Sequence, residues 1–237
     1  MLNSIQIFSY TETNSIIHKI DSLNKLLTLI VFTLISFNNN IIIHLILILY
    51  LIILIILSKI KIISYVKSIK NITYLLVAIF LINIICKMDI ILNLINIFRI
   101  IEIVIYSSII TMTTKTDELI SGLYRLLIPL KIFKININKI VFILIMSIKL
   151  IPVIIDEFNK TIKGLKGKGV GAKNKLLMIK SIVIPTFSLI IRKSDNIVTD
   201  LEFKLYNYEN IKITNNWKLI DTIIFIIHIF ILILLWR

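Results

Sequence analysis

Long apolar runs separated by short polar stretches dominate the first half of the chain. The run from Ile41 to Leu57 contains no Lys, Arg, Asp or Glu and consists mostly of isoleucine and leucine. A helix needs about 20 mostly apolar residues to cross a bilayer, and several runs in this sequence approach that length. The pattern therefore predicts an all-α, polytopic membrane protein.

The alternation of apolar runs and polar stretches predicts about five transmembrane helices. Asp21 precedes the first run and is a candidate N-cap, because its carboxylate can accept hydrogen bonds from the unpaired N–H groups of a helix start. Residues 38–40 form a short polar turn, and residues 58–71 form a lysine-rich connection. The predicted helices cover Leu26 to Phe37, Ile41 to Leu57, about Ile72 to Ile85, about Ile90 to Met112, and Leu219 to Trp236.

The region from residue 115 to residue 216 has a different pattern. Charged residues interrupt its apolar positions too often for a membrane domain, and the pattern predicts two long amphipathic helices, about Asn138 to Lys166 and about Lys175 to Leu205. Proline removes a backbone donor and disturbs the preceding turn, so three positions are candidate helix kinks: Pro129, Pro152 and Pro185. The predicted domains are residues 1–114, 115–216 and 217–237.

The distribution of charge predicts the orientation. The chain has 27 Lys and Arg against 13 Asp and Glu, a formal net charge of +14. Lysines concentrate in residues 58–71 and 115–218, whereas the turns at 38–40 and 87–89 carry almost no net charge. By the positive-inside rule, the N-terminus and the 115–216 region are cytoplasmic and the last helix places the C-terminus outside. The charge suits a lipid bilayer as partner, and no basic-aromatic module indicates nucleic acid.

Few residues in the sequence indicate chemistry. The segment from Lys160 to Lys175 holds four of the five glycines, but Val170 and Gly171 stand where a Walker A phosphate loop needs Lys and then Ser or Thr. No spacing of His, Cys or carboxylates predicts a metal site or a cofactor, and no nucleophile–base arrangement predicts an enzyme. Arg99 and Glu102 lie three residues apart on one predicted membrane helix, where we expect them to pair with each other; a functional role is the alternative.

Blocks of residues spread over nearly the whole chain resemble the transmembrane T component of energy-coupling factor (ECF) transporters, the family of T subunits of vitamin and cobalt importers of the ABC type. His18-Lys19-Ile20-Asp21 with Lys25 is similar to the family's entry motif, with Ser22 in place of a proline. Three further blocks are similar to family motifs: Thr113-Thr114 with Leu126-Leu127-Ile128-Pro129-Leu130, Ser147 to Pro152, and Arg192, Asp195 and Glu202.

The family's signature is a pair of Ala-Arg-Gly tripeptides at the ends of two cytoplasmic coupling helices. By resemblance, the ATPase-docking residues of this chain are Gly167, Lys168, Gly169, Phe203, Lys204 and Leu205. Lysine replaces arginine in both tripeptides, so a point charge on a flexible stem replaces a rigid bidentate fork.

The resemblance implies a non-catalytic scaffold in a bacterial cell membrane. Its partners would be two ABC-type ATPase subunits, which hydrolyse ATP, and a membrane S component, which binds the vitamin or metal ion. The coupling helices would carry ATP-driven motion from the ATPases to the S component.

Two other classes of function stay open on the residues alone. A membrane-embedded enzyme, such as a lipid head-group transferase, generally has intramembrane Asp or His clusters, and here only Asp89, Arg99, Glu102 and Asp221 lie near or within the predicted N- and C-terminal spans. An autonomous secondary transporter predicts spans broken by Gly or Pro, and residues 1–112 contain neither.

Overall fold

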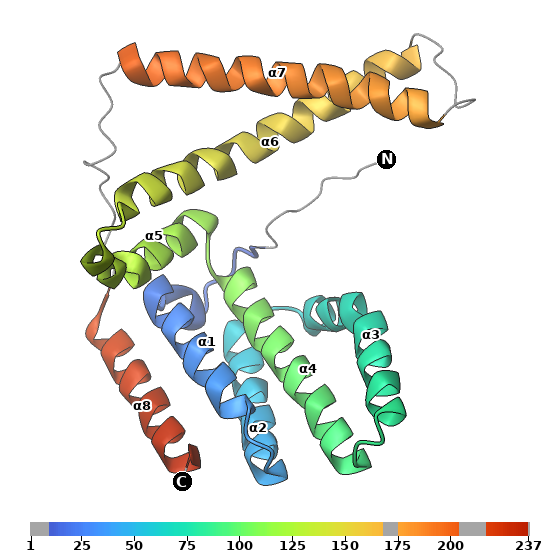
Figure 1. Ribbon diagram of the computed structural model, residues 1–237. Helices are drawn as coiled ribbons and strands as arrows, with labels where there is room; N and C mark the ends of the chain where they lie inside the picture. The colour runs from blue at the N-terminus through green and yellow to red at the C-terminus, as the bar shows by residue number, and fades with distance from the viewer. Residues whose placement is uncertain (1–9, 168–174, 204–216, 237) are drawn as a thin grey trace. The chain divides into compact units, whose positions relative to one another are not determined.

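The described parts of the protein consist mainly of helices (Figure 1). The computed structural model describes residues 10–167, 175–203 and 217–236, and within these ranges there is no strand, which confirms the all-α prediction. The helices are η1 (Ile17–Lys19), α1 (Ser22–Ser36), α2 (Ile41–Ser58), α3 (Ile62–Ile85), α4 (Ile90–Thr113), α5 (Thr116–Leu127), η2 (Ile128–Phe133), α6 (Ile137–Gly167), α7 (Lys175–Phe203) and α8 (Leu219–Trp236).

The chain divides into two compact units. Unit 1 comprises residues 1–126 and 214–237, and unit 2 comprises residues 127–213. Nearly all of α5 therefore belongs with the apolar helices, although the sequence pattern placed the boundary at residue 114. The reason is that α5 contacts the start of α1 through Gly122 and Arg125.

Among the residues that the structure describes, three helices of unit 1 are long and apolar enough to cross a membrane, namely α2, α3 and α4. The helix α1 is shorter, with 15 residues. The last helix, α8, has the bounds predicted from the sequence. The third helix differs from its prediction, because α3 begins at Ile62 and includes Lys67 and Lys70, which the sequence pattern assigned to a connection.

The N-terminal ends of α1 and α2 are capped by side chains. Asp21 Oδ1 accepts a hydrogen bond from the backbone N–H of Leu23 at 2.8 Å, which confirms the predicted cap. Asn40 Oδ1 accepts one from the N–H of Ile42 at 3.0 Å. Each cap satisfies a donor that the first turn of a helix leaves without an intrahelical partner. The polar turn at residues 38–40 is thereby confirmed.

Aromatic rings join three helices in the core of unit 1. Phe32 of α1 stacks on Tyr106 of α4, with ring centroids 4.5 Å apart, and the ring of Tyr50 of α2 lies 6.3 Å from Phe32 and 6.4 Å from Tyr106. Phe32 and Tyr106 are buried, and rings at this spacing gain about 0.5–1.5 kcal/mol per pair beyond the area they bury. The core thus fixes α1 against α2 and α4.

Helix α5 approaches the start of α1 so closely that a side chain would not fit between them. A Cβ atom at Gly122 would lie 2.8 Å from Ser22 Oγ, 2.9 Å from the Ser22 carbonyl carbon and 3.0 Å from the Leu23 nitrogen. Two of these atoms belong to the backbone and cannot rotate away. Glycine is therefore required here by packing.

We expect Gly122→Ala to lower the free energy of unfolding by about 1–3 kcal/mol, because the methyl group forces the two helices apart. Gly164→Ala is the matched control: Gly164 lies inside α6, and a Cβ there meets nothing within 4 Å. The control should be neutral or stabilising by up to about 1 kcal/mol, since alanine favours helix. Thermal unfolding in detergent measures both, and equal midpoints for the two variants would contradict the close approach.

Candidate functional site

The ammonium group of Lys25 is buried at one end of unit 1, where α4 ends. Lys25 Nζ donates to the carbonyl oxygen of Thr113 at 3.0 Å, to Thr113 Oγ1 at 3.3 Å and to Thr114 Oγ1 at 2.9 Å. Lys25 and both threonines are buried. An ammonium has three donors, and each has an acceptor here. The entry motif and the Thr-Thr motif, 88 residues apart, therefore meet at one cation.

A buried ion pair fastens α5 to the start of α1. Arg125 Nη2 lies 2.7 Å from Asp21 Oδ1 and 2.9 Å from Asp21 Oδ2. The side chain of Asp21 is 1% exposed and that of Arg125 is 12% exposed. A pair removed from water in this way must be well hydrogen-bonded to be tolerated, and Asp21 also accepts from the N–H of Leu23.

The same end of unit 1 holds Asp221, near the start of α8. Its Oδ1 accepts from the backbone N–H of Asp21 at 2.9 Å, and its Oδ2 accepts from the N–H of Lys218 at 2.8 Å. Its carbonyl oxygen accepts from Asn24 Nδ2 at 2.9 Å. The start of α1 is thus bonded to α8, 200 residues away in sequence.

We call Asp21, Lys25, Thr113, Thr114, Arg125 and Asp221 the polar hub. Its two carboxylates are matched by one ammonium and one guanidinium, so the buried charge sums to zero. The hub joins α1, α4, α5 and α8. Its contacts are structural, because its charged groups bond to the ends of neighbouring helices.

His18 makes its hydrogen bonds within the entry segment. Its Nε2 donates to the carbonyl of Thr11 at 2.9 Å, and its Nδ1 lies 2.7 Å from Ser15 Oγ. Thr11 in turn donates its N–H to the carbonyl of Met112 at 3.0 Å. Burial lowers the pKa of His18 below its ordinary value, and the hydrogen bond to Thr11 opposes this. In the neutral ring, Nδ1 accepts from the Ser15 hydroxyl.

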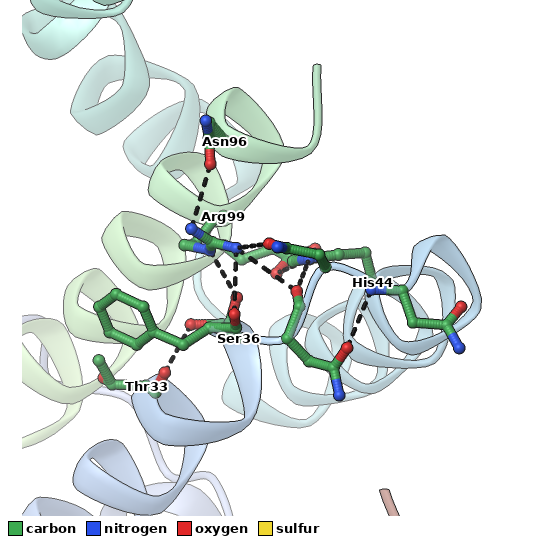
Figure 2. A network of polar contacts seen from close by, with 10 residues as sticks. Thr33, Ser36, His44, Asn96 and Arg99 are labelled. Atoms are coloured by element: carbon green, nitrogen blue, oxygen red, sulfur yellow. Dashed lines mark hydrogen bonds and ion pairs between the residues drawn. The ribbon is translucent and has the colours of Figure 1, made fainter. Parts of the chain in front are cut away.

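A second polar network lies at the opposite end of α1, around Arg99 of α4 (Figure 2). Arg99 Nε donates to the carbonyl of Ser36 at 2.6 Å, and Nη2 donates to the carbonyl of Phe37 at 3.2 Å and to Asn39 Oδ1 at 2.8 Å. Nη1 donates to Asn96 Oδ1 at 3.1 Å. The guanidinium therefore satisfies carbonyl groups that the end of α1 leaves without intrahelical donors.

Glu102 pairs with His44 of α2 rather than with Arg99. His44 Nδ1 lies 3.0 Å from Glu102 Oε2 and 3.2 Å from Oε1, and both residues are buried. His44 Nε2 donates to the carbonyl of Asn38 at 3.0 Å. The expected Arg99–Glu102 pair is therefore corrected: each charge has its own partner on another helix. The carbonyl groups at the end of α1 bind the Arg99 guanidinium, which is why it does not pair with Glu102.

In unit 2, α6 and α7 pack against each other. They contain 31 and 29 residues, which corresponds to lengths of about 46 and 44 Å. Lys193 Nζ of α7 lies 2.7 Å from Glu157 Oε1 of α6. The hydrogen bond from Lys193 lowers the pKa of Glu157, which is therefore ionised at neutral pH. The ion pair is partly exposed, so it fixes the register of the two helices more than it stabilises them.

Helix α7 also carries an exposed apolar stripe, which we define as Ile184, Phe187, Ile191 and Val198. These residues are exposed and separated by three, four and seven positions, so they lie along one face of the helix. The opposite side of α7 includes Ile182 and Thr186, which are buried. One face of α7 therefore packs within the structure and another is left open.

The docking residues expected from the sequence lie at the ends of these two helices. Gly167 is the last residue of α6, and Phe203 is the last residue of α7 and is 86% exposed. Lys168, Gly169, Lys204 and Leu205 lie outside the described residues. Of the candidate kinks, Pro129 lies in η2 directly after α5, whereas Pro152 and Pro185 lie inside α6 and α7. Their bending effect stays a prediction.

Arg125 was not singled out from the sequence, and Thr113 and Asp221 were noted there without their partners. Arg125, Thr113 and Asp221 bond to residues far away along the chain, so no local spacing could pair them. His44 did carry a signal, because one histidine within an otherwise apolar span needs a buried partner. Lys25 could be singled out from the sequence because it belongs to the entry motif.

Comparison with known proteins gives a family match over most of the chain. The family model described as "Cobalt transport protein" (CbiQ) matches residues 13–214. The energy-coupling factor transporter transmembrane protein EcfT of Staphylococcus aureus (strain 04-02981) is 31% identical over 134 residues, which are 53% of this chain and 50% of that protein. The EcfT of Lactococcus lactis subsp. cremoris (strain MG1363) is 29% identical over 153 residues, 59% of this chain and 56% of that protein.

The EcfT of Bacillus subtilis (strain 168) is 24% identical over 113 residues, 46% of this chain and 43% of that protein. The chain thus spans about half the length of the curated relatives it matches. The family match itself includes the entry motif, the Thr-Thr motif, α6 and α7. From this coverage we conclude that the chain belongs to the cobalt transport protein family.

Proposed function

We propose that this chain is the T component of an energy-coupling factor importer, a non-catalytic membrane scaffold that transmits ATP-driven motion. The observation that carries the proposal is the pair of long packed helices in unit 2, whose last residues, Gly167 and Phe203, are the first residues of the two tripeptides. ATP hydrolysis is assigned to two separate ATPase subunits, and substrate binding to an S component.

The helix ends suit a docking role for electrostatic reasons. The C-terminus of a helix carries about −0.5 of an elementary charge, which favours a cation next to it. Lys168 and Lys204 follow the last described residues of α6 and α7. We assign the two ammonium groups to acidic grooves on the ATPase pair, where Phe203 adds apolar contact.

The exposed stripe of α7 suits the S component. An apolar face on an otherwise charged region is costly in water and indicates a partner. We assign the surface around Phe187 and Ile191 to contact with the membrane-embedded S component, which would be tilted or released as the helices move. In this topology, the N-terminus and unit 2 face the cytoplasm and the C-terminus faces outward.

The polar hub supports the scaffold role, because it holds α5, after which the chain leaves unit 1, and α8, which follows its return to unit 1. The chain passes from α5 into η2, and it returns to unit 1 before α8. Arg125 bonds α5 to Asp21, and Asp221 bonds α8 to the same residue. Force applied to unit 2 would therefore reach the membrane helices through firmly held ends.

The test is a double charge reversal at the helix ends. We expect Lys168→Glu together with Lys204→Glu to abolish co-purification with the ATPase pair and to lower ATP-dependent uptake at least about tenfold, because each carboxylate would repel an acidic groove. The measurement uses the complete transporter, purified from membranes and reconstituted in liposomes.

The matched control reverses two exposed lysines away from the two docking ends, Lys67→Glu in α3 with Lys139→Glu in the first turn of α6, for the same change in net charge. It should leave assembly and uptake intact. If the end variant assembled and transported like this control, the docking roles would be wrong. Transport by the purified chain without ATPases would overturn the scaffold role as a whole.

A further inference from the structure

An apolar groove runs along α1 and α2 in unit 1. A cavity of about 240 Å³ is lined by residues of α1, α2, α4 and α8, and a cavity of about 150 Å³ continues it between α1 and α2. Tyr50 and Ile53 line both. For scale, about 150 Å³ of apolar cavity is enough to bind a benzene-sized molecule. The two cavities therefore lie next to each other along α2.

The groove is about as long as one bilayer leaflet is thick, and it is open at its side. Its lining extends along α2 from Ile46 to Leu57, about 17 Å at 1.5 Å per residue. Half of a 30 Å hydrocarbon core is about 15 Å. Helix α1 packs against both α2 and α8, which flank it (Figure 1). The rim residues Ile53 and Ile227 are about half exposed, so the groove is accessible from the side.

One end of the groove holds a buried acceptor without a donor. Asn24 lines the larger cavity and is fully buried; its Nδ2 donates to the Asp221 carbonyl, but its Oδ1 has no hydrogen-bond partner among the described residues. The neighbouring Lys25 cannot serve, because its three donors go to Thr113 and Thr114. Leaving such an acceptor unpaired costs about 1–3 kcal/mol. Because Asn24 has no exposed surface, a ligand in the groove does not reach this acceptor, which marks only the polar end of the groove.

The same end of the groove carries positive charge on three of the segments that form it. Lys19 precedes the groove-lining Ile20, Lys59 follows Leu57 at the end of α2, and Lys218 precedes α8, and all three lysines are exposed. At the opposite end, the turn at residues 38–40 contains no lysine. The groove is therefore apolar along its length and cationic at one mouth.

We infer that this groove binds one acyl chain of an anionic glycerophospholipid. The chain lies along α2, and the phosphate lies among Lys19, Lys59 and Lys218. The lipid would fill the space between α2 and α8 beside the polar hub.

The first test fills the groove. Full-length protein in dodecyl maltoside is mixed with phosphatidylglycerol, and the retained lipid is counted by native mass spectrometry. Ile53→Trp should reduce retention at least about tenfold, because the indole occupies the shared part of both cavities. Ile52→Trp is the matched control: Ile52 is also 48% exposed on α2 and lines neither cavity. Equal retention by the two variants would overturn the groove as the site.

The second test needs no core substitution. Lys19→Gln, Lys59→Gln and Lys218→Gln together should reduce the preference for phosphatidylglycerol over phosphatidylcholine at least about fivefold, while Lys67→Gln leaves it unchanged. Equal binding of the two lipids by the unmodified protein would overturn the anionic specificity.

Discussion

Arg125→Leu is expected to lower the free energy of unfolding by about 3–5 kcal/mol, because it leaves the buried carboxylate of Asp21 without its cation. The loss exceeds the net strength of the ion pair, since the remaining charge stays at a site with 1% exposure. The N–H of Leu23 still donates to Asp21, but one neutral donor does not replace a guanidinium. Thermal unfolding in detergent measures the change.

A second substitution separates the unpaired charge from the loss of packing. Asp21→Asn removes the charge and keeps an oxygen that can cap α1, since asparagine caps helices as well as aspartate does. The double variant, with Arg125→Leu and Asp21→Asn, should therefore be more stable than Arg125→Leu alone. Arg192→Leu, at an exposed position on α7, is the control and should change stability by less than about 0.5 kcal/mol. If Arg125→Leu behaved like this control, the ion pair would not hold α5.

The effect on function should follow the effect on structure. Arg125 bonds the last helix of unit 1 before the chain enters unit 2. If the proposed function is right, a loosened α5 transmits less of the movement of α6 and α7. ATP hydrolysis by the complete transporter would then continue while uptake falls, an uncoupling that simple misfolding does not produce.

The helices were predictable from the sequence because their signals are local. Apolar runs, the Asp21 cap and the glycines after residue 163 mark helix starts and ends within a few residues. The error at the start of α3 has the same origin: Lys67 and Lys70 resemble a connection, although a helix can extend beyond its apolar part into a charged turn. The local sequence pattern therefore predicts the presence of a helix more accurately than the residue at which its exposed end lies.

The polar hub could be predicted only in part, because its bonds are made by tertiary structure. The motif residues His18, Asp21 and Lys25 were recognised, but nothing in their spacing points to Thr113 or Asp221. For Arg99, the local rule was misleading. Spacing of three residues predicts a helical pair, but the carbonyl groups at the end of α1 compete for the same guanidinium.

His44→Leu is expected to lower the free energy of unfolding by about 3–5 kcal/mol, because Glu102 then remains buried without its partner. The carbonyl of Asn38 also loses the donor that His44 Nε2 supplies. Leucine fills most of the volume of the imidazole ring, so the loss reports polar contacts more than a cavity. The measurement is thermal unfolding in detergent, with exposed Arg192→Leu as the reference.

Glu102→Gln complements His44→Leu, because it tests whether the His44–Glu102 pair requires a charged carboxylate. His44 Nε2 must carry a proton, since a carbonyl only accepts, so Nδ1 and the carboxyl group share one further proton. The amide of glutamine can donate to Nδ1, which keeps the imidazole neutral and both of its hydrogen bonds intact. Glu102→Gln should therefore cost less than about 1 kcal/mol, and His44→Leu with Glu102→Leu should recover most of the loss of His44→Leu. If Glu102→Gln were as damaging as His44→Leu, the pair would depend on a full carboxylate charge, and its role would extend beyond fastening α2 to α4.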